Sequence, residues 1–193
     1  MPALPVALLT GFEPYVEGLA VNPSWEIVRP LDGAEVEGFR VRAARLPVAY
    51  GAAARALEAA VGEARPAAIV SFGMHRRGRL VEVERRFRFA EREGEALEAE
   101  DGAARERATR LPVERILAAL AAAGYEARAS DDAGLYVCEH TGFAAIGIAR
   151  RLERDLGGAG RAAAAPLAGF VHVPAPAELA IERQLAIPRA VLA

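Results

Sequence analysis

The chain has 193 residues, of which 53% are hydrophobic and 26% are charged, with a formal net charge of -2 and an isoelectric point near 6.0. A chain of this length can bury roughly 70% of its unfolded surface, and we expect a single domain over residues 1–193. The balanced charge excludes a general attraction to nucleic acid or anionic lipid, and no run of about 18 apolar residues could span a membrane.

Missing residue types exclude several kinds of chemistry. The sequence contains no lysine, which excludes a P-loop, a Schiff base and a Ser–Lys dyad. One cysteine, Cys138, and three separated histidines, His75, His140 and His172, give no zinc-ligand spacing. The N-terminus does not resemble a signal peptide and a single cysteine cannot form an intrachain disulfide, so we expect a cytoplasmic protein.

The first half of the chain alternates apolar strands with helices. Residues 5–10 are an apolar run that predicts a buried strand, and Asn22 followed by Pro23 predicts a helix start. A strand, an alanine-rich amphipathic helix and a central strand that is apolar on both faces are predicted over 39–47, 48–64 and 67–73.

Residues 78–89 alternate between apolar and charged side chains, which predicts one strand with a charged face. One side of it carries Val81, Val83, Phe87 and Phe89, and the other carries Glu82, Glu84, Arg86 and Arg88. The simplest interpretation of the charged side is a solvated ladder of ion pairs. The segment 90–110 is charged and poor in bulky apolar residues, so we expect an exposed loop or a mobile lid there.

The second half continues the same alternation. A helix, a strand, a helix, a strand and a closing helix are predicted over 111–124, 125–130, 136–156, 167–173 and 176–193. Strands that alternate with helices of ten or more residues predict an α/β fold, with a mostly parallel sheet covered on both faces. Ligands in such sheets bind beyond the carboxyl ends of the strands.

Cys138 lies within the first one or two turns of the helix predicted over 136–156. The positive end of the helix dipole favours a thiolate there, although a buried apolar cysteine is the commoner role. His140 is two positions further on and therefore about 200° around the helix, so we expect it on the outer face and not beside the thiol.

His172 is the better candidate for a catalytic base. It ends the buried strand of GFVHVPAP, and Pro174 follows directly, so the imidazole lies where α/β active sites form. His75, which also follows a strand, is the second candidate. Glu82 and Glu84 share one face of their strand, and either carboxylate could orient the base.

Three separated segments together resemble one family of cysteine peptidases. These are LLTGFEPYVEGLAVNPSWEI, SDDAGLYVCEHTGF and GFVHVPAP, over 8–27, 130–143 and 169–176, and a weaker fourth is GRLVEVERRFRF over 78–89. They resemble the T-G-F-E-P-F, S-x-x-A-G-x-Y-x-C-N, G-F-x-H-V-P and G-R-x-x-x-x-x-E-R-V-A-x-N segments of the pyrrolidone-carboxylate peptidases, also called pyroglutamyl peptidase I. The matches follow the family's order from end to end of the chain.

The resemblance implies a three-layer α/β/α sandwich around a mostly parallel twisted sheet, of the phosphorylase/hydrolase-like type. It also implies that Cys138 is the nucleophile, that His172 is the general base and then acid, and that Glu84 holds the imidazole. The substrates would be peptides with N-terminal pyroglutamate, hydrolysed without a metal or cofactor. Substrate contacts are expected from Phe12, Tyr15, Met74, Arg92 and Val137. Relatives commonly form homodimers or homotetramers, although no apolar stripe in this sequence indicates an interface.

Three departures from the family pattern leave alternatives open. Met74 and His75 stand where a glutamine is usual, which favours an amidase for another small N-acyl or cyclic group as an alternative function. The fourth segment is one residue short, so Glu82 remains a rival of Glu84. Glu139 replaces an asparagine beside Cys138, where its charge would oppose thiolate formation. That replacement is compatible with a non-catalytic relative that binds small ligands.

Overall fold

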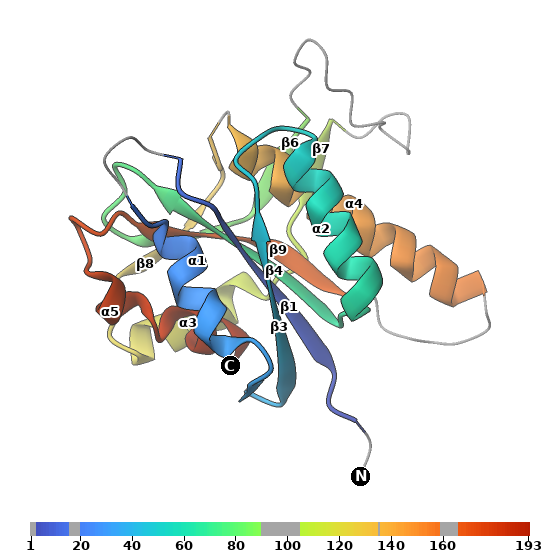
Figure 1. The fold of residues 1–193 in the computed structure, drawn as a ribbon, viewed down its shortest axis with the longest axis horizontal. Helices are drawn as coiled ribbons and strands as arrows, with labels where there is room; N and C mark the ends of the chain where they lie inside the picture. Colours follow the sequence, from blue (N-terminus) through green and yellow to red (C-terminus); the bar gives the residue numbers. More distant parts are fainter. Residues whose placement is uncertain (1–2, 16–19, 90–104, 135, 159–165) are drawn as a thin grey trace.

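Seven strands form one mixed sheet in the computed structural model, which describes residues 3–15, 20–89, 105–134, 136–158 and 166–193 (Figure 1). In spatial order the strands are β2 (Glu35–Val36), β3 (Phe39–Leu46), β1 (Val6–Phe12), β4 (Ala68–His75), β9 (Leu167–Pro174), β5 (Val81–Glu84) and β8 (Ala127–Ser130). The four strands from β3 to β9 are parallel, whereas β5 is antiparallel to β9 and parallel to β8, and β2 is antiparallel to β3.

Helices cover both faces of this sheet, so the predicted three-layer α/β/α architecture is confirmed (Figure 1). Helices α2 (Ala52–Ala64) and α4 (Val137–Gly158) lie on one face. The opposite layer contains α1 (Pro23–Val28), the short 3-10 helix η1 (Arg29–Leu31), α3 (Val113–Ala122), and α6 (Ile187–Leu192), which follows the four-residue α5 (Ile181–Gln184). No helix in the described part of the chain is long and apolar enough to cross a membrane.

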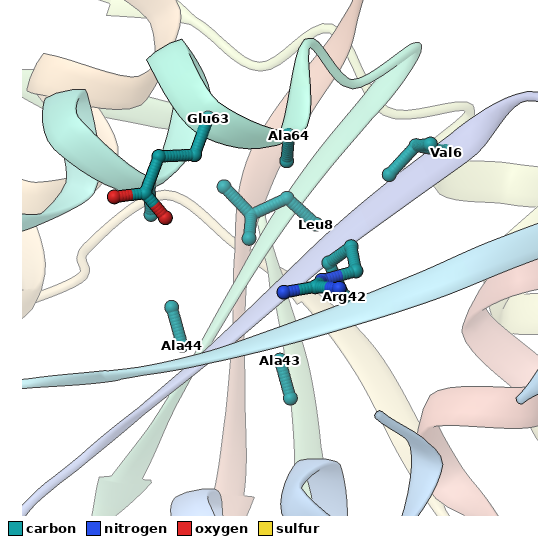
Figure 2. Close-up of a pocket in the computed structure, with 8 residues that line it drawn as sticks. Val6, Leu8, Arg42, Ala43, Ala44, Glu63 and Ala64 are labelled. Carbon is teal, nitrogen blue, oxygen red and sulfur yellow. The ribbon is translucent and has the colours of Figure 1, made fainter. Parts of the chain in front are cut away.

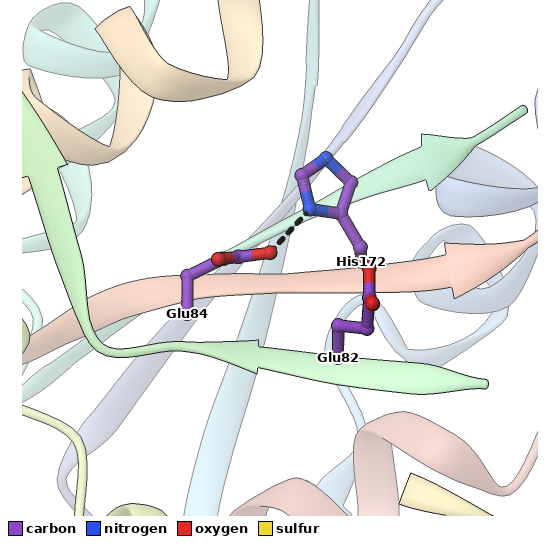
Figure 3. A group of neighbouring side chains, drawn as sticks. All are labelled: Glu82, Glu84 and His172. Carbon is purple, nitrogen blue, oxygen red and sulfur yellow. Dashed lines mark hydrogen bonds and ion pairs between the residues drawn. The ribbon is translucent and has the colours of Figure 1, made fainter. Parts of the chain in front are cut away.

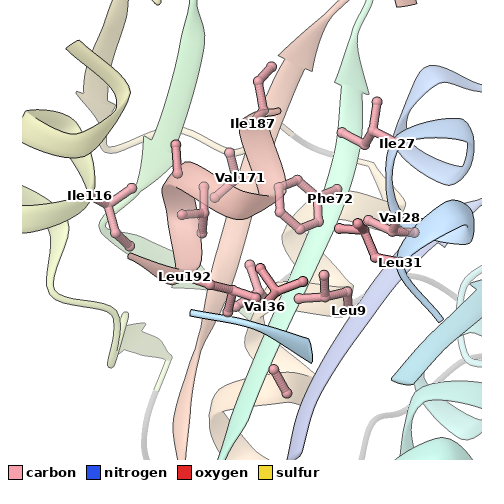
Figure 4. Packing of buried hydrophobic residues seen from close by; sticks show 14 of the residues in the cluster. Leu9, Ile27, Val28, Leu31, Val36, Phe72, Ile116, Val171, Ile187 and Leu192 are labelled. Carbon is pink, nitrogen blue, oxygen red and sulfur yellow. The ribbon is translucent and has the colours of Figure 1, made fainter. Parts of the chain in front are cut away.

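Alternation along the strands divides the apolar residues between the two helical layers. Leu9, Phe72 and Val171 pack toward α1, α3 and α6 (Figure 4). Their strand neighbours Leu8 and Phe170 pack toward α2 and α4. A sheet buried on both faces requires apolar residues at successive positions, which explains the near-continuous apolar runs in the sequence.

The end of β1 supports α1 through a close backbone approach. Asn22 caps the helix, as predicted, because its Oδ1 accepts a hydrogen bond from the Ser24 N–H at 3.1 Å. The Ser24 hydroxyl in turn accepts one from the Phe12 N–H at 3.0 Å. A Cβ atom at Gly11 would lie 2.4 Å from the Ser24 carbonyl oxygen, so this contact requires glycine.

The single charged strand predicted over 78–89 is wrong in two respects. The chain bends at Arg85 and forms two strands, β5 and β6 (Arg86–Arg88). All four residues of β5 are buried, including Glu82 and Glu84, whose carboxylates pair with histidine and arginine side chains on the side that the sequence indicated as solvated. After the bend, Phe87 packs against α4, on the opposite side from Val83.

The predicted loop over 90–110 and the predicted closing helix over 176–193 also differ from the structure. Residues 90–104 lie outside the described residues, but β7 (Glu106–Ala108) pairs antiparallel with β6 and ends the loop earlier than expected. The closing segment is divided into α5 and α6, and Pro188 stands in the first turn of α6, where a missing N–H does no harm.

We expect opposite effects on stability from two glycine-to-alanine substitutions. Gly11→Ala should lower the free energy of unfolding by about 1–3 kcal/mol, because the new methyl group meets backbone atoms of α1 that cannot move freely. Gly62→Ala on α2 is the matched control, since nothing lies within 4 Å of its added methyl group. It should stabilise the protein by about 0.5–1 kcal/mol through helix propensity. Urea unfolding measures both, and equal midpoints for the two variants would contradict the close contact at Gly11.

Candidate active site

The thiol of Cys138 and the imidazole of His172 meet at the junction of α4 with the central sheet. Cys138 is the second residue of α4, and its thiol lines the same cavity as the imidazole of His172 on β9, with which it interacts electrostatically. Gly73 on β4 is the register neighbour of His172. A Cβ atom at Gly73 would lie 3.0 Å from the Cys138 Sγ, so the absence of a side chain there leaves room for the thiol.

The antiparallel pairing of β5 with β9 gives His172 a buried carboxylate partner. Glu82 is directly opposite His172 in this pairing, and Glu84, two residues further along, shares the same face. The His172 Nδ1 lies 2.8 Å from the Glu84 Oε1, and the Glu84 side chain is fully buried (Figure 3). Because a carboxylate only accepts hydrogen bonds, the Nδ1–H donates, and the other ring nitrogen remains for Cys138.

The carboxylate of Glu82 pairs with a different histidine, His75. Its Oε2 lies 2.6 Å from the His75 Nδ1, and its Oε1 accepts hydrogen bonds from the Arg128 guanidinium. Carboxylate and imidazole ligand atoms of Glu82, Glu84 and His172 lie within 4.8 Å of one another, a spacing that could hold a metal ion. Since both Glu82 oxygens already accept hydrogen bonds and the His172 Nδ1 donates to Glu84, these groups fit proton chemistry better than metal ligation.

The environment of His172 favours its charged form. Burial lowers the pKa of His172, but the Coulombic attraction and hydrogen bond of Cys138, together with those of Glu84, raise that pKa to about 10. The imidazole therefore retains its proton at neutral pH while it lies between two groups that can carry negative charge. Such an arrangement is suited to an imidazolium–thiolate pair.

Glu139, the neighbour of Cys138, is directed toward the β6–β7 hairpin. Its Oε1 accepts a hydrogen bond from the Arg88 N–H at 2.5 Å. Burial raises the pKa of Glu139, although the Arg88 hydrogen bond and charge oppose that shift. The hydrogen bond and charge of Arg88 therefore offset part of the opposition of Glu139 to a thiolate at Cys138.

Buried contacts hold the β6–β7 hairpin against α4. The Arg107 Nη1 donates a hydrogen bond to the Phe143 carbonyl at 2.8 Å, and the guanidinium carbon lies 3.8 Å from the centre of the Phe143 ring. Phe87 packs against Gly142, where a Cβ atom would lie 2.2 Å from the ring. These contacts fix the position of the helix that carries Cys138.

The predicted outer-face position of His140 is wrong. His140 is buried, because α2 packs against α4 and covers that side of the helix. Its ring is 5.6 Å from that of Tyr50 in an edge-to-face arrangement, and its Nε2 accepts a long hydrogen bond from the Gly51 N–H at 3.4 Å. His140 therefore belongs to the contact between the two helices.

A cavity of about 380 Å³ opens beside the Cys138 thiol and is called the Cys138 cavity here. Tyr15 and Met74, two of the predicted substrate contacts, line it together with Cys138 and His172. Phe12 and Val137 are instead buried in the hydrophobic cluster between the sheet and α4. Arg92 lies outside the described residues.

The cavity lining also contains residues that sequence reasoning did not select. Tyr136 is 46% exposed, and its ring lies 6.3 Å from that of Tyr15 and 5.5 Å from that of Tyr50. Arg128 also belongs to this lining, where it forms an ion pair with Glu82. Tyr136 lies inside the SDDAGLYVCEHTGF segment, which is a usable signal, whereas Arg128 is identified only by the pairing of β8 with β5.

A second cavity, of about 330 Å³, lies between β1, β3 and α2 (Figure 2). Its lining consists of Val6, Leu8, Arg42, Ala43, Ala44, Ala60, Glu63 and Ala64. This lining contains no hydroxyl, thiol or imidazole group, and its ionisable groups are those of Glu63 and Arg42 alone. The chemistry of the described residues is concentrated at the Cys138 cavity.

Comparisons with known proteins agree with this geometry. The sequence model of the family described as pyroglutamyl peptidase matches residues 6–192. A pyrrolidone-carboxylate peptidase from Cupriavidus taiwanensis is 35% identical over 181 residues, which cover 89% of this chain and 79% of the relative. One from Gloeobacter violaceus is 36% identical over 177 residues, which cover 86% and 80%.

Solved structures show the same fold. The crystal structure of pyroglutamyl peptidase I from Bacillus amyloliquefaciens has a TM-score of 0.83 at 24% identity and covers 97% of this chain and 95% of its own. Pyrrolidone carboxyl peptidase from the hyperthermophile Pyrococcus furiosus has a TM-score of 0.75 at 26% identity, with coverages of 97% and 96%. With a family model that spans residues 6–192, the chain belongs to the pyroglutamyl peptidase family.

Proposed function

We propose that this chain is a cysteine exopeptidase that hydrolyses the amide bond after an N-terminal pyroglutamyl residue. The observation that carries the proposal is the connected series Cys138, His172 and Glu84, in which an imidazole lies beside a thiol at one cavity and is hydrogen-bonded to a buried carboxylate. Family membership supplies the substrate class, and the connected series supplies the chemistry.

The first half of the reaction forms an acyl-enzyme. The Cys138 thiolate attacks the carbonyl carbon that joins the pyroglutamyl residue to the peptide, and the carbonyl oxygen becomes an oxyanion. Because α4 begins at Val137, the Cys138 N–H lies in the first turn without an acceptor in the helix and can donate to this oxyanion. The tetrahedral intermediate then collapses, the C–N bond breaks, and the His172 imidazolium gives its proton to the leaving amine.

The second half releases the product. His172, now neutral, accepts a proton from a water molecule, which attacks the thioester carbon. The C–S bond breaks, free pyroglutamate leaves, and the thiolate and imidazolium are restored. Throughout the cycle Glu84 accepts the Nδ1–H of His172, which keeps the ring oriented and stabilises its charged form.

The Cys138 cavity is suited to a small ring. Its volume of about 380 Å³ is at the small end for ligand sites, and its aromatic residues Tyr15 and Tyr136 can contact the flat faces of a lactam. Met74 adds an apolar, adaptable surface in place of the glutamine that the family resemblance suggests. We expect the enzyme to act in a reducing cytoplasm, and its association into a homodimer or homotetramer stays a prediction.

Met74 also favours a second candidate function, an amidase for another small N-acyl or cyclic group. A cavity wall without an amide side chain loses one means of recognising the lactam by hydrogen bonds. Assays that compare pyroglutamyl, acetyl, formyl and prolyl amides decide between the two candidates. Turnover of another amide, with pyroglutamyl amides untouched, would establish the second candidate.

Replacement of either reacting group should abolish the activity. Cys138→Ala removes the nucleophile, and release of a fluorophore from a pyroglutamyl amide should fall below detection. His172→Ala removes the proton donor and acceptor and should lower kcat by about 10²–10⁴-fold or more. Circular dichroism of both variants verifies that they fold, and normal turnover by Cys138→Ala would end the proposal.

The two glutamates of β5 should differ sharply in their effect on catalysis. Glu84→Gln replaces the acceptor of the His172 Nδ1–H by a group that can also donate, so we expect kcat to fall by about 10²–10⁴-fold. Glu82→Gln changes the partner of His75 and is the matched variant, for which we expect a smaller loss. Steady-state kinetics on one pyroglutamyl amide tests both, and a larger loss in Glu82→Gln would assign the orienting role to Glu82.

The titration of His172 should depend on Cys138. With its pKa raised to about 10, His172 should remain protonated from pH 6 to 9, and its ring protons should titrate only near pH 10. Cys138→Ala removes two of the effects that raise this pKa while burial still lowers it, so the titration should move to lower pH. NMR of the histidine ring protons measures the shift. An unchanged titration in Cys138→Ala would show that the thiol does not interact with His172.

A further inference from the structure

The turn that follows β4 presents two arginines next to the Cys138 cavity. The Gly78 N–H donates a hydrogen bond to the His75 carbonyl at 3.1 Å and closes a turn over residues 75–78. Arg76 and Arg77 occupy its two central positions and are exposed. Within the described ranges of the chain neither arginine forms an ion pair, so both positive charges are available to a ligand.

His75, the first residue of this turn, is held in a fixed position. Its Nδ1 lies 2.6 Å from the Glu82 Oε2, and Gly78 packs so closely that a Cβ atom there would lie 2.5 Å from the same nitrogen. Burial raises the pKa of Glu82, but hydrogen bonds from Arg128 and His75 outweigh it and lower that pKa. The negative charge of Glu82 is therefore matched by its own two partners and does not neutralise Arg76 or Arg77.

Two cavities meet at His75. One is the Cys138 cavity, and the other, of about 400 Å³, is lined by His75, Arg76 and Arg77. The charge of Arg76 also acts on Tyr15, which lines the Cys138 cavity. Burial and the charge of Cys138 raise the pKa of Tyr15, and the charge of Arg76 opposes this shift. A peptide that extends from the Cys138 thiol past His75 therefore reaches the two arginines.

The direction of the substrate follows from exposure. The blocked residue of an exopeptidase substrate occupies the enclosed end of its cavity, and the leaving peptide must extend toward solvent. The Cys138 cavity is closed by Met74 and His172, which are about 6% exposed, whereas the His75 side chain is 45% exposed. Tyr15 and Tyr136 are also partly exposed in this lining, but they are the expected contacts of the lactam, so the leaving part of the substrate is directed over His75 and the turn.

We propose that Arg76 and Arg77 bind an acidic side chain in the leaving peptide, so that the enzyme prefers pyroglutamyl peptides with Asp or Glu within the first residues after the scissile bond. This inference rests on the proposed function and adds a substrate class to it. An exposed charge pair changes binding by roughly two- to fivefold, and salt screens it. The preference should therefore be moderate, and it should weaken as ionic strength rises.

Competition between matched peptides tests the inference. The substrates are pyroglutamyl tetrapeptides with Glu, Gln or Lys at the second and third positions, and the readout is the ratio of kcat/KM values at low and high salt. We expect the Glu peptide to exceed the Gln peptide by about four- to twenty-fivefold at low salt, from two charge pairs, and the Lys peptide to be the poorest. The preference should nearly vanish at about 1 M salt.

Substitutions of the two arginines test whether the preference for acidic peptides arises from the turn over residues 75–78. Arg76→Gln and Arg77→Gln should each reduce the Glu-to-Gln ratio by about two- to fivefold, and the double variant should abolish it. Arg65→Gln is the control, because Arg65 precedes β4 and lies at the opposite end of that strand from His75. Its ratio should equal that of the unmodified enzyme.

The outcomes separate this inference from the proposed function. Equal kcat/KM values for the Glu and Gln peptides, or a preference that survives in the double variant, would overturn the role of Arg76 and Arg77 while the peptidase assignment stands. Failure to hydrolyse even an uncharged pyroglutamyl amide would instead overturn the proposed function. Gly78→Ala provides a second measurement, since the displaced His75 should reduce the same ratio in a protein whose arginines are intact.

Discussion

A buried imidazole–carboxylate pair, His172 with Glu84, constrains the architecture of this enzyme more than any other interaction. Neither group could be enclosed alone, because an unpaired buried charge is costly, and together they satisfy each other at 2.8 Å. The pair exists because β5 runs antiparallel to β9 in an otherwise largely parallel sheet. This reversal brings a carboxylate from one strand beside the imidazole of the next, under the first turn of α4.

The position of α4, which lies beside that pair, is as important as the pair itself. α4 supplies Cys138 and packs on β9 beside His172, and contacts with a second element hold it in place. Arg107 and Glu139 provide these contacts by binding the β6–β7 hairpin to the helix through buried polar groups. Glu139 therefore has a structural reason to replace an uncharged residue beside the nucleophile, and the hydrogen bond and charge of Arg88 limit the electrostatic cost.

The sequence predicted the elements that carry the reacting groups, because apolar runs and 3.6-residue periodicity define β1, β4, β9, α2 and α4 strongly. It could not predict the bend at Arg85, since strict alternation continues through it. It could not choose between Glu82 and Glu84, which share a face and differ only in register with β9. The burial of His140 depended on the packing of α2 against α4, a long-range contact that no local pattern contains.

Two histidine–carboxylate pairs of the same composition lie side by side, and burial decides what each can do. The rings of His75 and His172 are 5.7 Å apart, and each Nδ1 faces a glutamate of β5. His172 is enclosed against Cys138, where a thiolate and a carboxylate can stabilise its charge. His75 is half exposed, and Arg128 shares its glutamate, so the charge of Glu82 is divided. The enclosed pair is therefore suited to proton transfer and the exposed pair to the positioning of a substrate.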